Sequence, residues 1–168
     1  MDKNQDILTA LGMIGGTGGI EVIESPRDVI NNKTSDVRRI LVDAKNDMEN
    51  FNAFAHKMNY VTPNVDTAFH TKAMYDATDG NFVRGLIALG AGVYKEYLDM
   101  KKYTKDHDFW YALNESAKDM GNNINGVWKS WLNPNLPSDQ HPKIKNLQTP
   151  TMRNIMPLYE ALKNDKKD

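Results

Sequence analysis

Apolar residues recur at intervals of three and four positions from Asp36 to Met58 in this chain of 168 residues. This spacing is typical of an α-helix with one apolar face. Thr34 or Ser35 can cap its first turn, because a side-chain hydroxyl there accepts a hydrogen bond from a free backbone N–H. We therefore expect residues 36–58 to form the main structural helix. The apolar positions are Val37, Ile40, Leu41, Ala44, Met48, Phe51, Phe54, Ala55 and Met58.

A break follows this helix at residues 60–64. Pro63 lacks a backbone N–H and disfavours helical geometry at Thr62, so a regular helix cannot continue through it. A second helix is expected from Val65 to about Thr78, with Asn64 as its cap.

Two further helices are predicted after a turn at Asp79-Gly80-Asn81. The turn should return the chain antiparallel into a third helix from Phe82 to about Tyr103. A charged break at residues 104–108 precedes a fourth helix that reaches Trp131. No strand pattern is present beyond Ile20–Ile23. The sequence thus predicts an all-α protein, a compact bundle of four to six helices.

The two ends differ from this periodic centre, residues 36–131, which we expect to be the core domain. Residues 1–35 contain a cluster of glycines that chiefly adds backbone freedom, so a flexible N-terminal segment is predicted, in which Ser25-Pro26 is a turn or a helix start. Five of the seven prolines lie in residues 132–168, and this Pro-rich segment should form an extended arm that wraps over the domain or onto a partner. A short terminal helix at residues 151–164 should be broken at Pro157.

Charge and composition exclude several classes of function. The 21 basic and 22 acidic residues give a net charge of −1, so no general field would recruit nucleic acid or an anionic membrane. Cysteine is absent, which excludes thiol catalysis and leaves the compartment open. We identify no signal peptide, and the apolar run at 83–93 is about half of the roughly 20 residues that cross a bilayer. A soluble protein is expected, cytoplasmic as synthesised or virion-associated.

A candidate polar site begins at Glu96 and Asp99, which are three residues apart and share one face of the third helix. Gly90, Ala91 and Gly92 lie about one turn earlier, where small side chains allow another helix to approach closely. This segment can therefore bring its acids towards polar groups on neighbouring helices.

Polar residues on the second and fourth helices are the expected partners. His70 lies one turn from Asp66, a pair that either faces a shared cavity or is an ordinary exposed pair. Asp119 and Asn123 share a face of the fourth helix, and Gly126 leaves room beside it. We expect a groove between these three helices on which five side chains converge: His70, Glu96, Asp99, Asp119 and Asn123.

The spacing of these residues resembles that of the YfiM-type lipoprotein and VanZ-like families. Three elements occur in order between about residues 66 and 130: Asp66 with His70, Gly92-x-x-x-Glu96, and Asp119-x-x-x-Asn123-x-x-Gly126. The resemblance implies a helical architecture, a polar site and association with the cell envelope. The chain departs from the pattern in the four-residue spacing of the first pair, in Ser130 at a position where glycine is common, and in lacking the families' membrane anchor or spans.

One functional hypothesis is a metal-assisted hydrolase that acts on a cell-envelope component. Glu96 or His70 would act as general base, Asn123 would donate to developing negative charge, and Asp99 and Asp119 would hold a divalent metal ion or orient the base. The candidate catalytic residues are His70, Glu96, Asp119 and Asn123. The candidate metal ligands are Glu96, Asp99 and Asp119, a carboxylate set that suits a hard divalent ion.

The other hypothesis is a structural or accessory protein of an assembly, such as a phage virion or a cell-envelope complex. The same polar residues would then form a buried network that fixes helix register, and the terminal arms would dock onto protein partners or other copies of the chain. We favour this interpretation slightly, because no residue pair is a recognisable nucleophile with its base.

Overall fold

The computed structural model describes residues 25–106 and 108–165. Within them lie six helices and no strand, which confirms the all-α prediction. The helices are α2 (Pro26–Lys57), α3 (Val65–Thr78), α4 (Phe82–Asp106), α5 (Phe109–Leu132), α6 (Pro142–Lys145) and α7 (Pro150–Asn164). The glycine cluster of the N-terminal segment lies outside the described residues.

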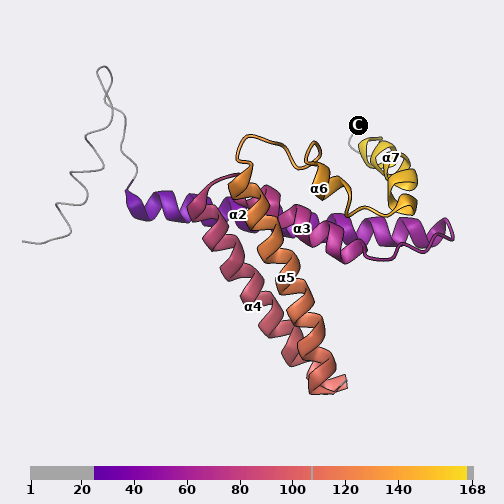
Figure 1. The fold of residues 1–168 in the computed structure, drawn as a ribbon, viewed down its shortest axis with the longest axis horizontal. Helices are drawn as coiled ribbons and strands as arrows, with labels where there is room; N and C mark the ends of the chain where they lie inside the picture. The colour runs from indigo at the N-terminus through magenta and orange to yellow at the C-terminus, as the bar shows by residue number, and fades with distance from the viewer. Residues whose placement is uncertain (1–24, 107, 166–168) are drawn as a thin grey trace, which may run out of the picture.

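The molecule consists of a body and a projecting helix pair (Figure 1). In the body, α3 lies along α2, with α6 and α7 beside them. Helices α4 and α5 pack side by side and extend away from the body together. The predicted antiparallel return of α4 along α3 is therefore wrong, because α4 turns away from α3 and pairs mainly with α5.

Helix α2 begins ten residues earlier than its apolar pattern predicts. Ser25 is its N-cap: its hydroxyl oxygen accepts a hydrogen bond from the backbone N–H of Asp28 at 3.2 Å. Pro26 occupies the first helical position, where its missing N–H costs nothing. The predicted caps Thr34 and Ser35 are wrong, since both lie inside this helix.

Helix α3 has the predicted bounds, because Pro63 and the 79–81 turn delimit it. Asn64 stands at the N-cap position but has a left-handed backbone (φ 61°), and its side chain makes no capping hydrogen bond. The capping role expected for this side chain is therefore wrong.

Helix α7 runs without interruption through Pro157, so the predicted break is wrong. Pro157 is exposed, and the carbonyl group that loses its helical partner can bind water instead. The opposite face of α7 buries Met152, Ile155 and Tyr159 against α2 and α3. Packing on this face compensates for the one missing hydrogen bond.

Two apolar clusters hold the helices together, one within the body and one between the body and the α4–α5 pair. The first joins α2, α3 and α7 through Phe51, Ala55, Val65, Ala68, Met152, Ile155 and Tyr159. The second joins α2 to α3, α4 and α5 through Val37, Met74, Ala77, Ala88 and Val127. The segment predicted as a C-terminal arm thus runs over the domain, one of its two expected courses, and contributes side chains to the core.

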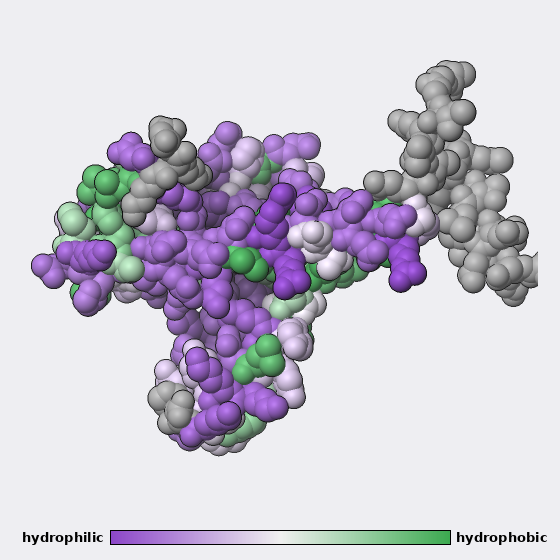
Figure 2. Space-filling model, turned by 180° about the vertical axis from the view of Figure 1, so that it is seen from behind, coloured by the Kyte–Doolittle hydropathy of each residue, from purple (hydrophilic) through white to green (hydrophobic). Residues whose placement is uncertain are grey.

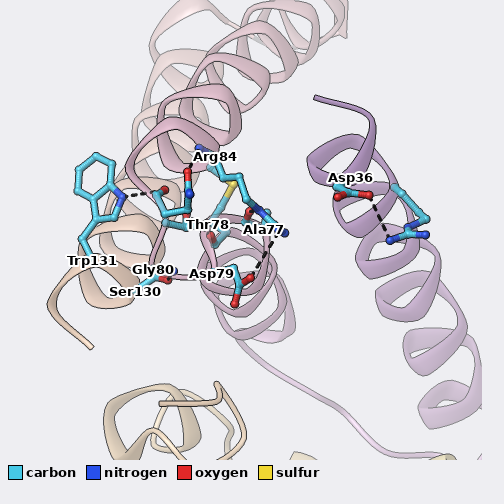
Figure 3. A network of polar contacts seen from close by, with 11 residues as sticks. Asp36, Ala77, Thr78, Asp79, Gly80, Arg84, Ser130 and Trp131 are labelled. Atoms are coloured by element: carbon cyan, nitrogen blue, oxygen red, sulfur yellow. Dashed lines mark hydrogen bonds and ion pairs between the residues drawn. The ribbon is translucent and has the colours of Figure 1, made fainter. Parts of the chain in front are cut away.

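Polar contacts fix the turn between α3 and α4 (Figure 3). Asp79 and Gly80 have positive φ angles of 49° and 64°. The backbone N–H of Gly80 donates to Ser130 Oγ at 2.8 Å, and the indole N–H of Trp131 donates to the carbonyl oxygen of Asn81 at 3.3 Å. Arg84 Nε donates to the Ala77 carbonyl oxygen at 2.9 Å. The first two bonds tie the end of α5 to the turn, and the third ties the start of α4 to the end of α3.

Candidate functional site

A groove of about 630 Å³ is lined by side chains from α2, α3, α4 and α5. Its volume is within the range of small-molecule sites. The apolar part includes Val37, Leu41, Met48, Phe69, Met74 and Ile87. The polar part includes Asp66, His70, Lys95, Asp99, Asp119 and Asn123.

The structure brings the five predicted site residues into one region. His70, Asp99, Asp119 and Asn123 line the groove, and Glu96 is buried on the same face of α4 as Gly92, another lining residue. Their convergence was expected from spacing alone. The catalytic roles assigned to these residues remain predictions.

His70 and Asn123 form the direct polar contact between α3 and α5 in this groove. Nδ1 of His70 is 3.4 Å from Oδ1 of Asn123, and the Asn123 residue is 2% exposed. An amide oxygen only accepts, so a hydrogen bond here requires the proton on Nδ1. With a proton on Nδ1, this contact links α3 to α5.

Gly92 makes room for this contact. A Cβ atom on Gly92 would lie 2.8 Å from Asn123 Nδ2 and 3.5 Å from the terminal methyl of Met74. Any side chain at this position would push the amide away from α4. By contrast, a Cβ atom on Gly90 would have no neighbour within 4 Å. Close approach of another helix in the same chain therefore accounts for Gly92 and does not account for Gly90.

Lys95 joins the two acids of α4. Its Nζ donates to Glu96 Oε1 at 3.1 Å and to Asp99 Oδ2 at 2.8 Å. The Glu96 side chain is almost fully buried, whereas those of Lys95 and Asp99 are partly exposed. Lys95 was not identified as a site residue from the sequence, although its i,i+4 spacing to Asp99 is the usual signal of a helical ion pair.

Burial has the largest effect on the pKa of Glu96. It raises the pKa of this carboxyl group above its usual 4.5, and the charge of Asp119 raises it further. The ion pair with Lys95 and the nearby His70 oppose the shift without cancelling it. The pKa of Lys95 is lowered by burial and raised by its bonds to Asp99 and Glu96, with a net increase. Lys95 therefore keeps its proton and partly neutralises Glu96 and Asp99.

The predicted metal ligands are not assembled as a metal site. Among the described residues, no three His, Cys, Asp or Glu side chains are grouped closely enough to hold a metal ion. Glu96 and Asp99 instead share the ammonium group of Lys95, which occupies the position of a cation between them. The donor set Glu96, Asp99 and Asp119 therefore does not fit the divalent ion that the hydrolase hypothesis requires.

Polar bonds elsewhere link the same helices. Asn122 Nδ2 donates to Thr67 Oγ1 at 3.3 Å, which ties α5 to α3 beside the His70–Asn123 contact. The role that this region supports most directly is positioning of helices: partly buried polar bonds join α3 to α5, and Lys95 pairs the acids within α4.

Comparisons with known proteins do not assign the chain to a family. No protein-family model matches it, and no curated protein or solved structure matches it. The resemblance to the YfiM-type and VanZ-like families therefore remains a prediction.

Proposed function

We propose that this chain is a structural or accessory subunit of a protein assembly, and that the α4–α5 pair is the element that binds a partner. One observation carries the proposal: the pair presents a long, exposed apolar face on the side away from α3. The cell envelope and the virion remain predictions about where such an assembly operates.

Helix α5 contributes a continuous apolar stripe to this face. Its members are spaced by three or four residues, as on one side of a helix, and every one is exposed. Trp110 is 74% exposed and Trp128 is 58% exposed, which are large fractions for tryptophan side chains. The stripe consists of Trp110, Leu113, Ala117, Gly121, Ile124, Trp128 and Leu132.

Helix α4 carries a matching stripe with the same kind of spacing, and its residues are also exposed. The stripe consists of Phe82, Leu86, Gly90, Val93 and Tyr97. We refer to the two stripes together as the outer face.

Contacts on both sides of the pair show that the two stripes face the same way. The ring of Trp131 stacks on Phe82 at 5.1 Å and meets Trp128 edge-on at 6.3 Å, so it joins the stripes at the base of the pair. Gly126 and Gly92 lie on the other side, where Cβ atoms would contact Met74 of α3. The outer face is thus the side of the pair that α3 leaves uncovered.

A face of this kind indicates a binding surface. Monomeric soluble proteins rarely expose a contiguous apolar patch larger than a few hundred Å². Figure 2 shows a side of the molecule that is mostly hydrophilic, with its hydrophobic surface in separate patches. No helix among the described residues is long and apolar enough to span a membrane. Helix-on-helix docking to another protein is the binding mode that the stripe spacing favours.

Site-specific photo-crosslinking in the cells that make the protein tests the proposal. A photoreactive amino acid replaces Ile124 on the outer face or, as a matched control, Ile30 on α2. Both isoleucines are 52% exposed, so they differ in location and not in accessibility. Light should produce a discrete protein adduct from position 124 and none from position 30. If position 124 gives no protein adduct, the proposed function is wrong.

A further inference from the structure

We infer that the occupant of the outer face is a second copy of this chain, and that two α4–α5 pairs close into an antiparallel four-helix bundle. The inference rests on the proposed function and identifies the partner. Four features of the pair support a second copy: the matching spacing of the two stripes, the area of the face, the position of two glycines and the charge at the tip.

The outer face has the form of half a four-helix bundle. Helices α4 and α5 contain 25 and 24 residues, so the pair has no overhanging end. Both stripes use three- and four-residue steps, which produce the ridges and grooves that interlock when helices pack. A second copy offers the same length and the same spacing. In a dimer with twofold symmetry, the same surface of each copy contacts that of the other, so both outer faces are buried in one interface.

The area is sufficient for a stable dimer. At 1.5 Å per residue the α4 stripe spans about 23 Å and the α5 stripe about 33 Å, and each helix is about 10 Å wide. The outer face therefore covers about 560 Å² per copy, or about 1,100 Å² for two. A specific protein–protein interface should bury about 1,000 Å² or more in total.

Gly90 and Gly121 lie near the middle of their helices, within the two stripes. A Cβ atom at either position would have no neighbour within 4 Å, so neither glycine is required for packing inside one chain. In a helix interior, glycine is less favourable than alanine by about 1 kcal/mol. Close approach of a symmetry-related helix near the twofold axis gives both positions a structural role.

Charge at the tip of the pair favours the antiparallel orientation. Residues 101–108 carry three lysines, Lys101, Lys102 and Lys105, against Asp106 and Asp108, so the tip has a net charge of +1. Parallel pairing would bring these lysines of both copies to one end of the bundle, where like charges repel. Antiparallel pairing places the two tips at opposite ends.

Analytical ultracentrifugation of the full chain tests the inference across a range of concentrations. The wild-type protein should sediment as a dimer, with twice the mass of the 19.1 kDa chain. Ile124→Glu places an unpaired carboxylate in each of the two buried faces and should raise the dimer dissociation constant about 100-fold or more. Ile30→Glu introduces the same charge at the same exposed fraction and should leave the constant within about twofold. Circular dichroism verifies that both variants keep their helices.

Spin labels at the tip test the orientation. The chain contains no cysteine, so Lys102→Cys gives a single labelling site. The antiparallel bundle predicts that the labels of two copies are separated by about the length of the pair, roughly 36 Å or more. Label separations well below 20 Å would overturn the antiparallel arrangement.

The remaining outcomes separate the two proposals. A monomer at every concentration, together with a crosslink from position 124 to a different protein, would overturn the second copy and leave the proposed function standing. A monomer in which residues 1–24 of the same chain crosslink to position 124 would overturn both. A dimer that Ile124→Glu does not weaken would overturn the assignment of its interface to the outer face.

Discussion

Gly126 of α5 lies directly against the backbone of Thr71 in α3. A Cβ atom on Gly126 would lie 2.8 Å from Met74 Cβ and closer still to the carbonyl oxygen of Thr71. Thr71 is fully buried, and its hydroxyl oxygen has no hydrogen-bond partner. The two helices therefore cross at backbone distance, and this crossing sets the position of the whole α4–α5 pair.

Gly126→Ala should destabilise the protein by about 1–3 kcal/mol, because the added methyl group must separate α3 from α5. Chemical denaturation measures the change in the free energy of unfolding. Gly121→Ala is the matched control on the same helix. It adds a methyl group where no neighbour lies within 4 Å and should stabilise the helix by up to about 1 kcal/mol.

Both glycine variants are compared in the Ile124→Glu background, which removes self-association through the outer face from the measured stability. Equal effects of the two substitutions would contradict the close crossing of α3 and α5.

Glu96→Gln should change how stability depends on pH. Burial raises the pKa of Glu96 in the folded state above its usual 4.5, so the folded protein holds this proton more tightly than the unfolded chain does. The associated stability is fully present below pH 4.5 and is lost as the pH rises through the folded pKa. Wild type should therefore lose stability relative to Glu96→Gln over that interval.

Urea denaturation at a series of pH values from 4 to 8 measures this difference. The control Glu49→Gln removes an exposed carboxylate of α2 whose Lys45 partner is 3.8 Å away. The difference in the free energy of unfolding between wild type and this variant should change by less than about 0.5 kcal/mol over the series. If wild type instead gains stability relative to Glu96→Gln, the ion pair with Lys95 outweighs the burial of Glu96.

Met152→Ala should reduce stability by about 2–5 kcal/mol, because this fully buried side chain fills the cluster between α2, α3 and α7. Leu162→Ala removes a similar apolar volume from a side chain that is 44% exposed on the same helix, and should change stability by less than about 0.5 kcal/mol. Thermal or urea unfolding gives both values. A negligible effect at position 152 would mean that α7 does not belong to the core.

Tyr159→Phe should alter stability at alkaline pH. Burial, followed by the charge of Asp47 and a hydrogen bond to it, raises the pKa of Tyr159 to about 12. The phenol in the unfolded chain ionises near pH 10, so wild type should lose stability between pH 10 and 12 that the variant does not lose. At pH 7 the free energy of unfolding of the variant should be lower by about 0.5–1.5 kcal/mol, the usual net contribution of one hydrogen bond.

Unfolding curves at pH 7, 10 and 11.5 measure both parts of this prediction. Parallel loss of stability in the two proteins above pH 10 would show that Tyr159 ionises equally in the folded and unfolded states.

Local signals in the sequence predicted the bounds of α3 correctly. Pro63 and the Asp79-Gly80 turn act within a few residues of the helix ends, so no tertiary information was needed. The start of α2 was placed ten residues late, because residues 26–35 lack apolar periodicity although Ser25 and Pro26 form a capped start. The predicted break at Pro157 was wrong for a different reason. Burial of Met152 and Tyr159 on α7 outweighs the local tendency of proline to interrupt a helix.

Helical spacing predicted part of the candidate site as well. Helical spacing places Glu96 and Asp99 on one face, and the groove brings Asp99 together with His70 and Asn123. Spacing could not show that Lys95 would bind both acids, since several rotamers of a lysine reach different neighbours. The direction in which α4 leaves α3 depends on glycine contacts with distant residues, which no local pattern contains.

The bond between Tyr159 and Asp47 has a consequence for the synthesis of the chain. The tyrosine hydroxyl donates to the carbonyl oxygen of Asp47, a residue that is made 112 positions earlier. Ribosomes add about 5–20 residues per second, so the apolar face of α2 around Phe51 waits on the order of ten seconds for the helix that covers it. During that interval Phe51 is open to chaperones and to other nascent chains. Slowing of translation before α7 should therefore favour aggregation of this protein more than slowing after it.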